Sequence, residues 1–354
     1  MAEETNKNQI VQLKNNSLAK VSSTLELTNK LLQKIENRNT IPSNDFRVSI
    51  PDINFQRYLT DAFVILITDN CVAYGEIKHI EKIDFSSEED EKLNKIKSLE
   101  GIQHFTALTE LYCHENQITD LDLSQNTVLI KLCCSRNQIT DLDLSQNSAL
   151  TELSCDNNQL TDLDLSQNKM LTYLDCDNNQ LTDLDLSQNK MLTYLDCDNN
   201  QLTDLDVSQN KKLTYLHCGN NHLTDLDVSQ NTALIQLLWK KNQITDLDLS
   251  QNMALTDLSC WKNQLTDLDV SQNTALTDLS CWDNKLTNLD VSQNTALTEL
   301  WCGDNQLTNL NVSQNMALTD LSCWKNQLTD LDISKNKALK DSRIFIDRKV
   351  KIYR

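Results

Sequence analysis

Cysteine is the side chain with the greatest chemical potential in this sequence, and its spacing argues for a structural role. Ten of the twelve Cys recur every 21 residues from Cys113 to Cys323, with Trp239 in place of one member of the series. Zinc sites use closely spaced ligands such as C-x-x-C, which the sequence lacks, and the adjacent Cys133 and Cys134 would point to opposite faces of a strand. Stacked parallel side chains lack the torsion of a disulfide. We therefore expect an inward column of reduced, hydrophobic thiols and no metal site.

The remaining residues capable of catalysis do not form a recognisable set. None of the five His is expected beside a Ser or Cys nucleophile. His217 is expected near Asp175 and Asp196, but on an open sheet without a pocket. The phosphate-binding patterns G-x-x-x-x-G-K-[ST] and G-x-G-x-x-G are both missing from the sequence. The sequence therefore predicts a protein that is not an enzyme and uses no cofactor.

Aromatic residues recur with the same period and suit binding rather than catalysis. Three Tyr lie 21 residues apart, and four Trp follow in the last four periods, bordered by Lys. Large rings with a polar and basic rim are typical of binding surfaces, although stacked rings could equally shield the sheet or be inherited by repeat duplication. We favour a partner-binding surface at the Trp end, with the Tyr column as second choice. Its expected members are Trp261, Trp282, Trp301, Trp324, Lys262, Lys325, Tyr173, Tyr194 and Tyr215.

A 21-residue repeat must position these side chains. Leu recurs at this interval from Leu108 to Leu339, giving eleven units over 108–338, and a fixed period of this length indicates a solenoid. Numbered from this Leu, apolar residues occupy positions 1, 4, 6, 11, 14 and 16, as in LTELSCDNNQLTDLDLSQNKM. The pairs 4/6 and 14/16 have the period of a strand. We therefore expect one short strand in each half of every unit.

Asn occupies positions 9 and 19 in all eleven units. An Asn that turns inward after a strand can bind the backbone groups released by the bend, in its own coil and in the next. Two stacked columns of amides are therefore expected to satisfy groups that would otherwise be buried without partners.

This pattern resembles the leucine-rich repeat, L-x-x-L-x-L-x-x-N-x-L. The nested 21-residue form with Cys at position 6 is similar to the bacterial class called IRREKO repeats, and it covers residues 108–338. Segments 50–59 and 98–108 resemble the entry cap of internalin-like repeat proteins. In such relatives this cap often contains a calcium-type loop, but the stretch 69–76 lacks most of the oxygen ligands that calcium requires. The resemblance implies a protein that recognises other proteins.

The expected fold is mainly β: a right-handed leucine-rich-repeat solenoid with short parallel strands on two faces, plus a small helical N-terminal segment and cap. We divide it into an amphipathic helix and linker (1–44), a cap (45–107), the repeats (108–338) and a C-terminal capping strand (339–354). A solenoid needs such a lid to cover its last hydrophobic coil. The helix, expected over 7–38, either packs on the first coil or docks on another chain through a helix–helix contact.

The second half of the units is strongly acidic. Positions 13 and 15 hold nineteen Asp over the eleven units. Such a face either attracts cations or a basic partner, or keeps the protein soluble, and the uniformity of the units favours the second explanation.

Net charge and hydropathy narrow the possible partners. A formal charge of −19 argues against nucleic acid and anionic membranes. The N-terminus has no apolar signal region and no apolar run is long enough to span a membrane, so we expect a cytoplasmic location, with export by a signal-less route left open. The sequence predicts a non-catalytic protein–protein interaction module, such as a bacterial scaffold or signalling adaptor with an unidentified protein partner. The alternative is a structural or effector-type protein docked through its N-terminal helix.

Overall fold

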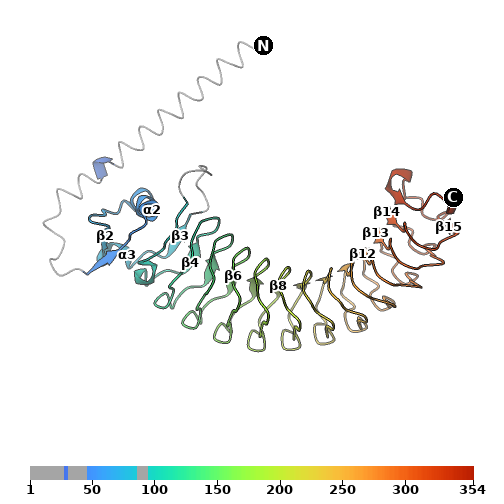
Figure 1. Ribbon diagram of the computed structural model, residues 1–354, viewed down its shortest axis with the longest axis horizontal. Helices are drawn as coiled ribbons and strands as arrows, with labels where there is room; N and C mark the ends of the chain where they lie inside the picture. The colour runs from blue at the N-terminus through green and yellow to red at the C-terminus, as the bar shows by residue number, and fades with distance from the viewer. Residues whose placement is uncertain (1–27, 31–45, 86–94) are drawn as a thin grey trace, which may run out of the picture.

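The computed structural model describes residues 28–30, 46–85 and 95–354. The repeat units form an arc of stacked coils (Figure 1). A 13-stranded parallel sheet lines the concave side of the arc. The mainly β solenoid expected from the period is thereby confirmed. The sheet contains β3 (Lys82–Asp84), β4 (Glu110–Tyr112), β5 (Lys131–Cys133), β6 (Glu152–Ser154), β7 (Tyr173–Asp175), β8 (Tyr194–Asp196), β9 (Tyr215–His217), β10 (Gln236–Leu238), β11 (Asp257–Ser259), β12 (Asp278–Ser280), β13 (Glu299–Trp301), β14 (Asp320–Ser322) and β16 (Ile344–Phe345).

Equivalent residues of successive coils lie beside each other in the sheet. Tyr173 pairs with Tyr194 and Tyr194 with Tyr215, so each repeat position becomes a column along the solenoid axis. The Leu at position 4 of each repeat unit is the central residue of its strand and points inward. The residues at positions 3 and 5 point outward from the concave face. A residue type that recurs at one position therefore produces a continuous stripe on the surface or in the core.

The interior of the array consists of the apolar positions predicted from the sequence. Leu192, Leu195 and Cys197 are completely buried, as are their counterparts in neighbouring units, and Trp239 is buried where it replaces Cys. Removing each Leu side chain from water stabilises the fold by about 1.5–3 kcal/mol. The inward thiol column is thus part of the hydrophobic core, and all twelve cysteines are free.

The two Asn columns hold successive coils together. Asn200 at position 9 donates from Nδ2 to the carbonyl oxygens of Cys176 (3.1 Å) and Cys197 (3.2 Å), and its Oδ1 accepts from the Leu181 N–H at 3.0 Å. Asn210 at position 19 donates to the carbonyls of Leu186 and Asn189, both in the preceding coil. Each amide therefore bridges coils, as expected from the sequence.

The prediction of strands on two faces is wrong for most of the array. Among the described residues, the second half of the units has one strand, β15 (Asp330–Asp332), which pairs with β17 (Lys351–Tyr353) near the C-terminus. Elsewhere the Asp at position 15 binds within its own turn, as Asp206 does by accepting the Ser208 N–H at 2.8 Å. The coils fan apart on the convex side (Figure 1), and this separation prevents a second continuous ladder.

Both ends of the solenoid are covered. The N-terminal cap pairs β1 (Arg47–Ser49) with β2 (Cys71–Ala73) and contains α2 (Ile53–Phe63) and α3 (Tyr74–Ile77). Asp52 caps α2 and also accepts the Lys97 N–H at 2.8 Å, which ties the helix to the segment entering the first coil. At the other end, β16 extends the concave sheet and β17 pairs with β15, so two short strands take the place of the single capping strand expected from the sequence.

The helix expected over 7–38 lies outside the described residues except for 28–30, which are helical.

Candidate interaction surface

The candidate surface is the concave sheet, where positions 3, 5 and 7 of each unit face outward. Most of its strands have a half-exposed, buried, half-exposed pattern. The sheet is continuous over all eleven units, so its character changes along the arc only through these outward residues. Three zones follow: an acidic zone with a Tyr column in the middle, a slot, and a Trp and Lys zone toward the C-terminus.

The three predicted Tyr form a stack in the middle of the arc. Ring centroids of Tyr173 and Tyr194 are 4.4 Å apart, and those of Tyr194 and Tyr215 are 4.3 Å apart, with planes within 11° of parallel. Burial and the neighbouring charges raise the pKa of Tyr194. The hydroxyls therefore remain neutral, and the stack presents one half-buried aromatic edge to the concave side.

Acids beside the Tyr stack hold protons unusually tightly. Burial, together with the charges of Asp156 and Asp177, raises the pKa of Asp175 to about 7. Burial, together with the charges of Asp196 and Asp156, raises the pKa of Asp177 to about 6. Oxygen atoms of Asp156, Asp175 and Asp177 lie within 4.8 Å of one another, the one such group of potential metal ligands among the described residues. Carboxylate oxygens suit a hard cation, and close like charges favour a shared proton.

His217 compensates the neighbouring acids. Its Nδ1 lies 3.0 Å from Asp196 and its Nε2 lies 3.3 Å from Asp198, while Lys240 approaches Asp198 at 3.6 Å. Burial lowers the pKa of His217, but the two carboxylates outweigh it and raise the value to about 9. This arrangement is an ion-paired cluster on an open sheet.

The predicted Trp residues occupy three different settings. Trp261 and Trp282 stack at 4.6 Å with planes 11° apart, and the Lys262 ammonium lies 5.7 and 5.5 Å from their two centroids. Trp301 instead stacks on Phe345 of β16 at 6.3 Å. The sequence predicted four outward indoles but not this division, because it depends on which neighbouring column each ring leans against.

Trp324 packs beside Gly303 of the preceding coil. A Cβ at Gly303 would stand 2.8 Å from two atoms of the indole, so the glycine makes room for the ring. Lys325 covers this indole at 4.5 Å and pairs with Asp304 at 3.0 Å. Trp301 and Trp324 are 38% and 37% exposed, which leaves both rings accessible to a partner.

We did not predict from the sequence the acidic slot that lies next to the indoles. A hollow of about 340 Å³ is lined by Leu238, Asp257, Ser259, Asp278, Leu279, Ser280, Glu299 and Trp301. The signal was present in the sequence as acids at position 3 combined with Ser at position 5 in consecutive units. It becomes a site only when the coils stack and place those two columns side by side.

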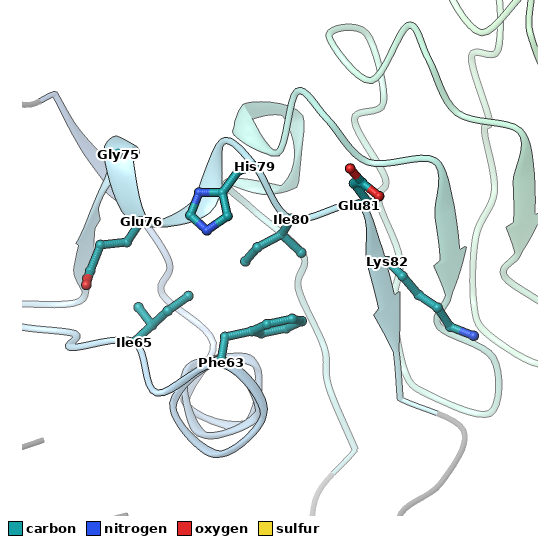
Figure 2. A pocket seen from close by; sticks show the side chains of 8 residues that line it. All are labelled: Phe63, Ile65, Gly75, Glu76, His79, Ile80, Glu81 and Lys82. Atoms are coloured by element: carbon teal, nitrogen blue, oxygen red, sulfur yellow. The ribbon is translucent and has the colours of Figure 1, made fainter. Parts of the chain in front are cut away.

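A second hollow of about 540 Å³ opens in the N-terminal cap (Figure 2). Phe63, Ile65 and Ile80 form its apolar side, and the charged ends of Glu76 and Glu81 extend in different directions. Its described lining includes no Ser, Thr or Cys. The hydroxyl and thiol nucleophiles that are typical of acyl transfer are therefore not among its lining residues.

The in-register strands, thiol column and Asn columns define a leucine-rich-repeat solenoid. A family model described as leucine rich repeats (2 copies) matches residues 169–210. The functional domain of InlJ from Listeria monocytogenes, described as including a cysteine ladder, is 38% identical with a TM-score of 0.77, over 87% of this chain and 72% of that one. The chain therefore belongs to the internalin-like leucine-rich-repeat proteins.

Two further structures share the architecture. The internalin InlF from Listeria monocytogenes is 25% identical, with a TM-score of 0.67, over 86% of this chain and 95% of that one. YopM from Yersinia enterocolitica is 25% identical, with a TM-score of 0.51, over 70% and 64% of the two chains. A comparison with curated proteins gave no match. Among the described helices, none is long and apolar enough to cross a membrane; the cytoplasmic location stays a prediction.

Proposed function

We propose that this chain is a non-catalytic protein-binding module, a scaffold or adaptor that engages a protein partner through its concave sheet. The observation that carries the proposal is the arrangement of aromatic side chains there. Stacked Trp261 and Trp282, with Lys262 near both rings, form a half-buried aromatic pair on the outward positions of the sheet. Such pre-positioned amphipathic rings are the residues that dominate binding energy in protein interfaces.

The proposal is tested by capturing partners with the full chain and measuring the affinity of the protein that is recovered. We expect the double change Trp261→Ala and Trp282→Ala to weaken binding at least tenfold. The melting temperature should fall only slightly, because the two half-buried rings stack on each other and neither belongs to the buried core. A matched variant, Tyr173→Ala with Tyr194→Ala, removes the other stack from the same sheet.

Two outcomes would contradict the proposal. If binding survives both double changes, the aromatic columns are not part of the interface. Binding that survives them and disappears on deletion of residues 1–44 would favour docking through the N-terminal segment, the alternative raised by the sequence. Loss on changing Tyr173 and Tyr194 alone would keep the concave sheet as the binding face but move its centre to the middle of the arc.

A further inference from the structure

The acids at position 3 of the sheet are compensated at both ends of the array but not beside the slot. Lys82 lies 3.6 Å from Glu110, and Lys131 lies 2.8 Å from Glu152. At the other end of the column, Arg343 reaches back from the C-terminal cap and binds Asp320 at 2.8 Å. The chain thus supplies its own cations for Glu110, Glu152 and Asp320.

Three consecutive acids between these points have no such partner. Asp257 pairs with Asp278 in the sheet and Asp278 with Glu299, so their carboxylates follow one another at the strand spacing of about 4.8 Å. No ion pair within the described residues involves any of the three. Like charges placed directly across a sheet destabilise it, and burial together with the two neighbours raises the pKa of Asp257. An external cation bound here would reduce the repulsion between these three carboxylates.

The hollow beside these acids has a shape that suits a side chain. Along position 5 the column runs Leu238, Ser259, Ser280, Trp301, so two small residues lie between two large ones. Three steps of about 4.8 Å separate the apolar ends by about 14 Å. The slot therefore has an apolar residue at each end, hydroxyls on its floor and carboxylates along one wall.

A row of acids favours a polypeptide over a single metal ion. The three carboxylates are spread over three coils, and they are not among the described groups whose oxygens converge on one point. Arg and Lys combine an apolar stem, which could pack against Leu238 or Trp301, with a charged head that reaches the acids. A guanidinium fits best, because it binds carboxylates with two N–H groups and stacks on indole.

We propose that this slot, formed by Leu238, Ser259, Ser280 and Trp301 with Asp257, Asp278 and Glu299 as its wall, binds an extended Arg- or Lys-containing segment of a protein partner. The inference rests on the proposed concave binding face and specifies the chemistry that it recognises. The contact between Arg343 and Asp320 is an interaction of the same kind within the chain, in which an Arg binds a carboxylate at position 3.

The test measures binding of a short fluorescent peptide in which Arg alternates with Ser to the full chain. The matched control peptide carries citrulline, a neutral isostere, in place of Arg. We expect Asp257→Asn with Asp278→Asn to weaken binding of the Arg peptide at least tenfold. A control variant with the same charge change on the convex side, Asp204→Asn with Asp267→Asn, should alter binding less than twofold. Binding should also weaken as salt is added.

Three results would overturn the inference. The slot variant could bind as tightly as the parent, the convex variant could lose as much affinity as the slot variant, or the citrulline peptide could bind equally well. The proposed function is judged separately, with the captured partner. If that partner is lost on changing Trp261 and Trp282 but retained by the Asn variant of the slot, the concave interface stands and the basic-segment proposal fails.

Discussion

At the scale of single residues, the Asn columns do most to unite the coils. The Asn200 side chain donates to carbonyls of two coils and accepts an N–H from the preceding one. Replacing it by Ala leaves those buried groups without partners, so we expect Asn200→Ala to lower the free energy of unfolding by about 1–3 kcal/mol. Gln201→Ala, at the adjacent exposed position, should be nearly neutral. Urea unfolding of the two variants checks this, and equal losses would contradict the role assigned to the column.

The titrating cluster on the concave face predicts how stability depends on pH. The pKa of Asp175 is raised to about 7 and that of His217 to about 9. Both groups therefore hold a proton more tightly in the folded chain than in the unfolded one. The stabilisation that they provide is complete below their ordinary pKa values and is lost as pH rises through the folded values. We expect the melting temperature to fall between pH 5 and pH 9.

Two variants separate the contributions to this decline. Asp175→Asn should flatten the part between about pH 5 and pH 7, and His217→Gln the part between about pH 7 and pH 9. Thermal melts across this range provide the measurement. A parent chain whose melting temperature is constant or increases over the same range would show that these protons are not bound as the cluster geometry requires.

Sequence reasoning was most reliable for residues whose role follows from the period. The inward Leu, Cys and Asn positions were identified because each recurs in the same setting in every unit. The shifted pKa values of Asp175 and Asp177 were not, since they arise from side chains that approach across coils. From the sequence, the Asp residues of the convex side were interpreted only as the source of an acidic face. Asp185 shows their local role, because hydrogen bonds from the Ser187 N–H and hydroxyl lower its pKa.

At the scale of elements, the difference between the two faces follows from curvature. On the concave side each strand finds its partner in the next coil, and on the convex side the coils diverge (Figure 1). The period-two pattern at positions 14 and 16 was correctly interpreted as inward-facing, since Leu205 and Val207 are buried. It could not reveal whether a neighbouring backbone lies close enough for a ladder. That distance depends on the stacking of whole coils.

The sequence did not predict the backbone conformation of the bend that follows each concave strand. Position 8 adopts a left-handed backbone in every unit, with φ between 46 and 58°. Only four of these positions are Asn and none is Gly; the others include Glu115, Arg136 and Lys262. Non-glycine residues rarely adopt this conformation, and the bend is nevertheless maintained in all eleven units, where the position 9 Asn bonds the released carbonyls.

Relief of this strain is measurable. We expect Asp283→Gly, where φ is 58°, to stabilise the chain by up to about 1 kcal/mol, because glycine adopts the left-handed region without a Cβ clash. Thr287→Gly, in the same unit at an exposed residue without positive φ, should instead destabilise it by about 0.5–1 kcal/mol. Chemical unfolding of both proteins provides the comparison. If both substitutions destabilise equally, the bend carries no such strain.

At the scale of the whole molecule, the arc presents one continuous sheet with distinct chemical zones. The middle carries the Tyr stack and the ion-paired acids, and the C-terminal third carries the Trp pair and the acidic slot. The turns that precede the strands carry exposed Met170, Met253 and Met316. An interaction through the concave sheet and one through the turns would therefore cover different oxidisable side chains.

Hydroxyl-radical footprinting of the full chain with its captured partner tests the concave interface most directly, because Trp and Met are both readily oxidised. The account predicts that the partner protects Trp261, Trp282 and Trp301 from oxidation while Met170, Met253 and Met316 react as in the free chain. Protection of the three Met with the three Trp unaffected would contradict it and place the partner on the turns that precede the strands.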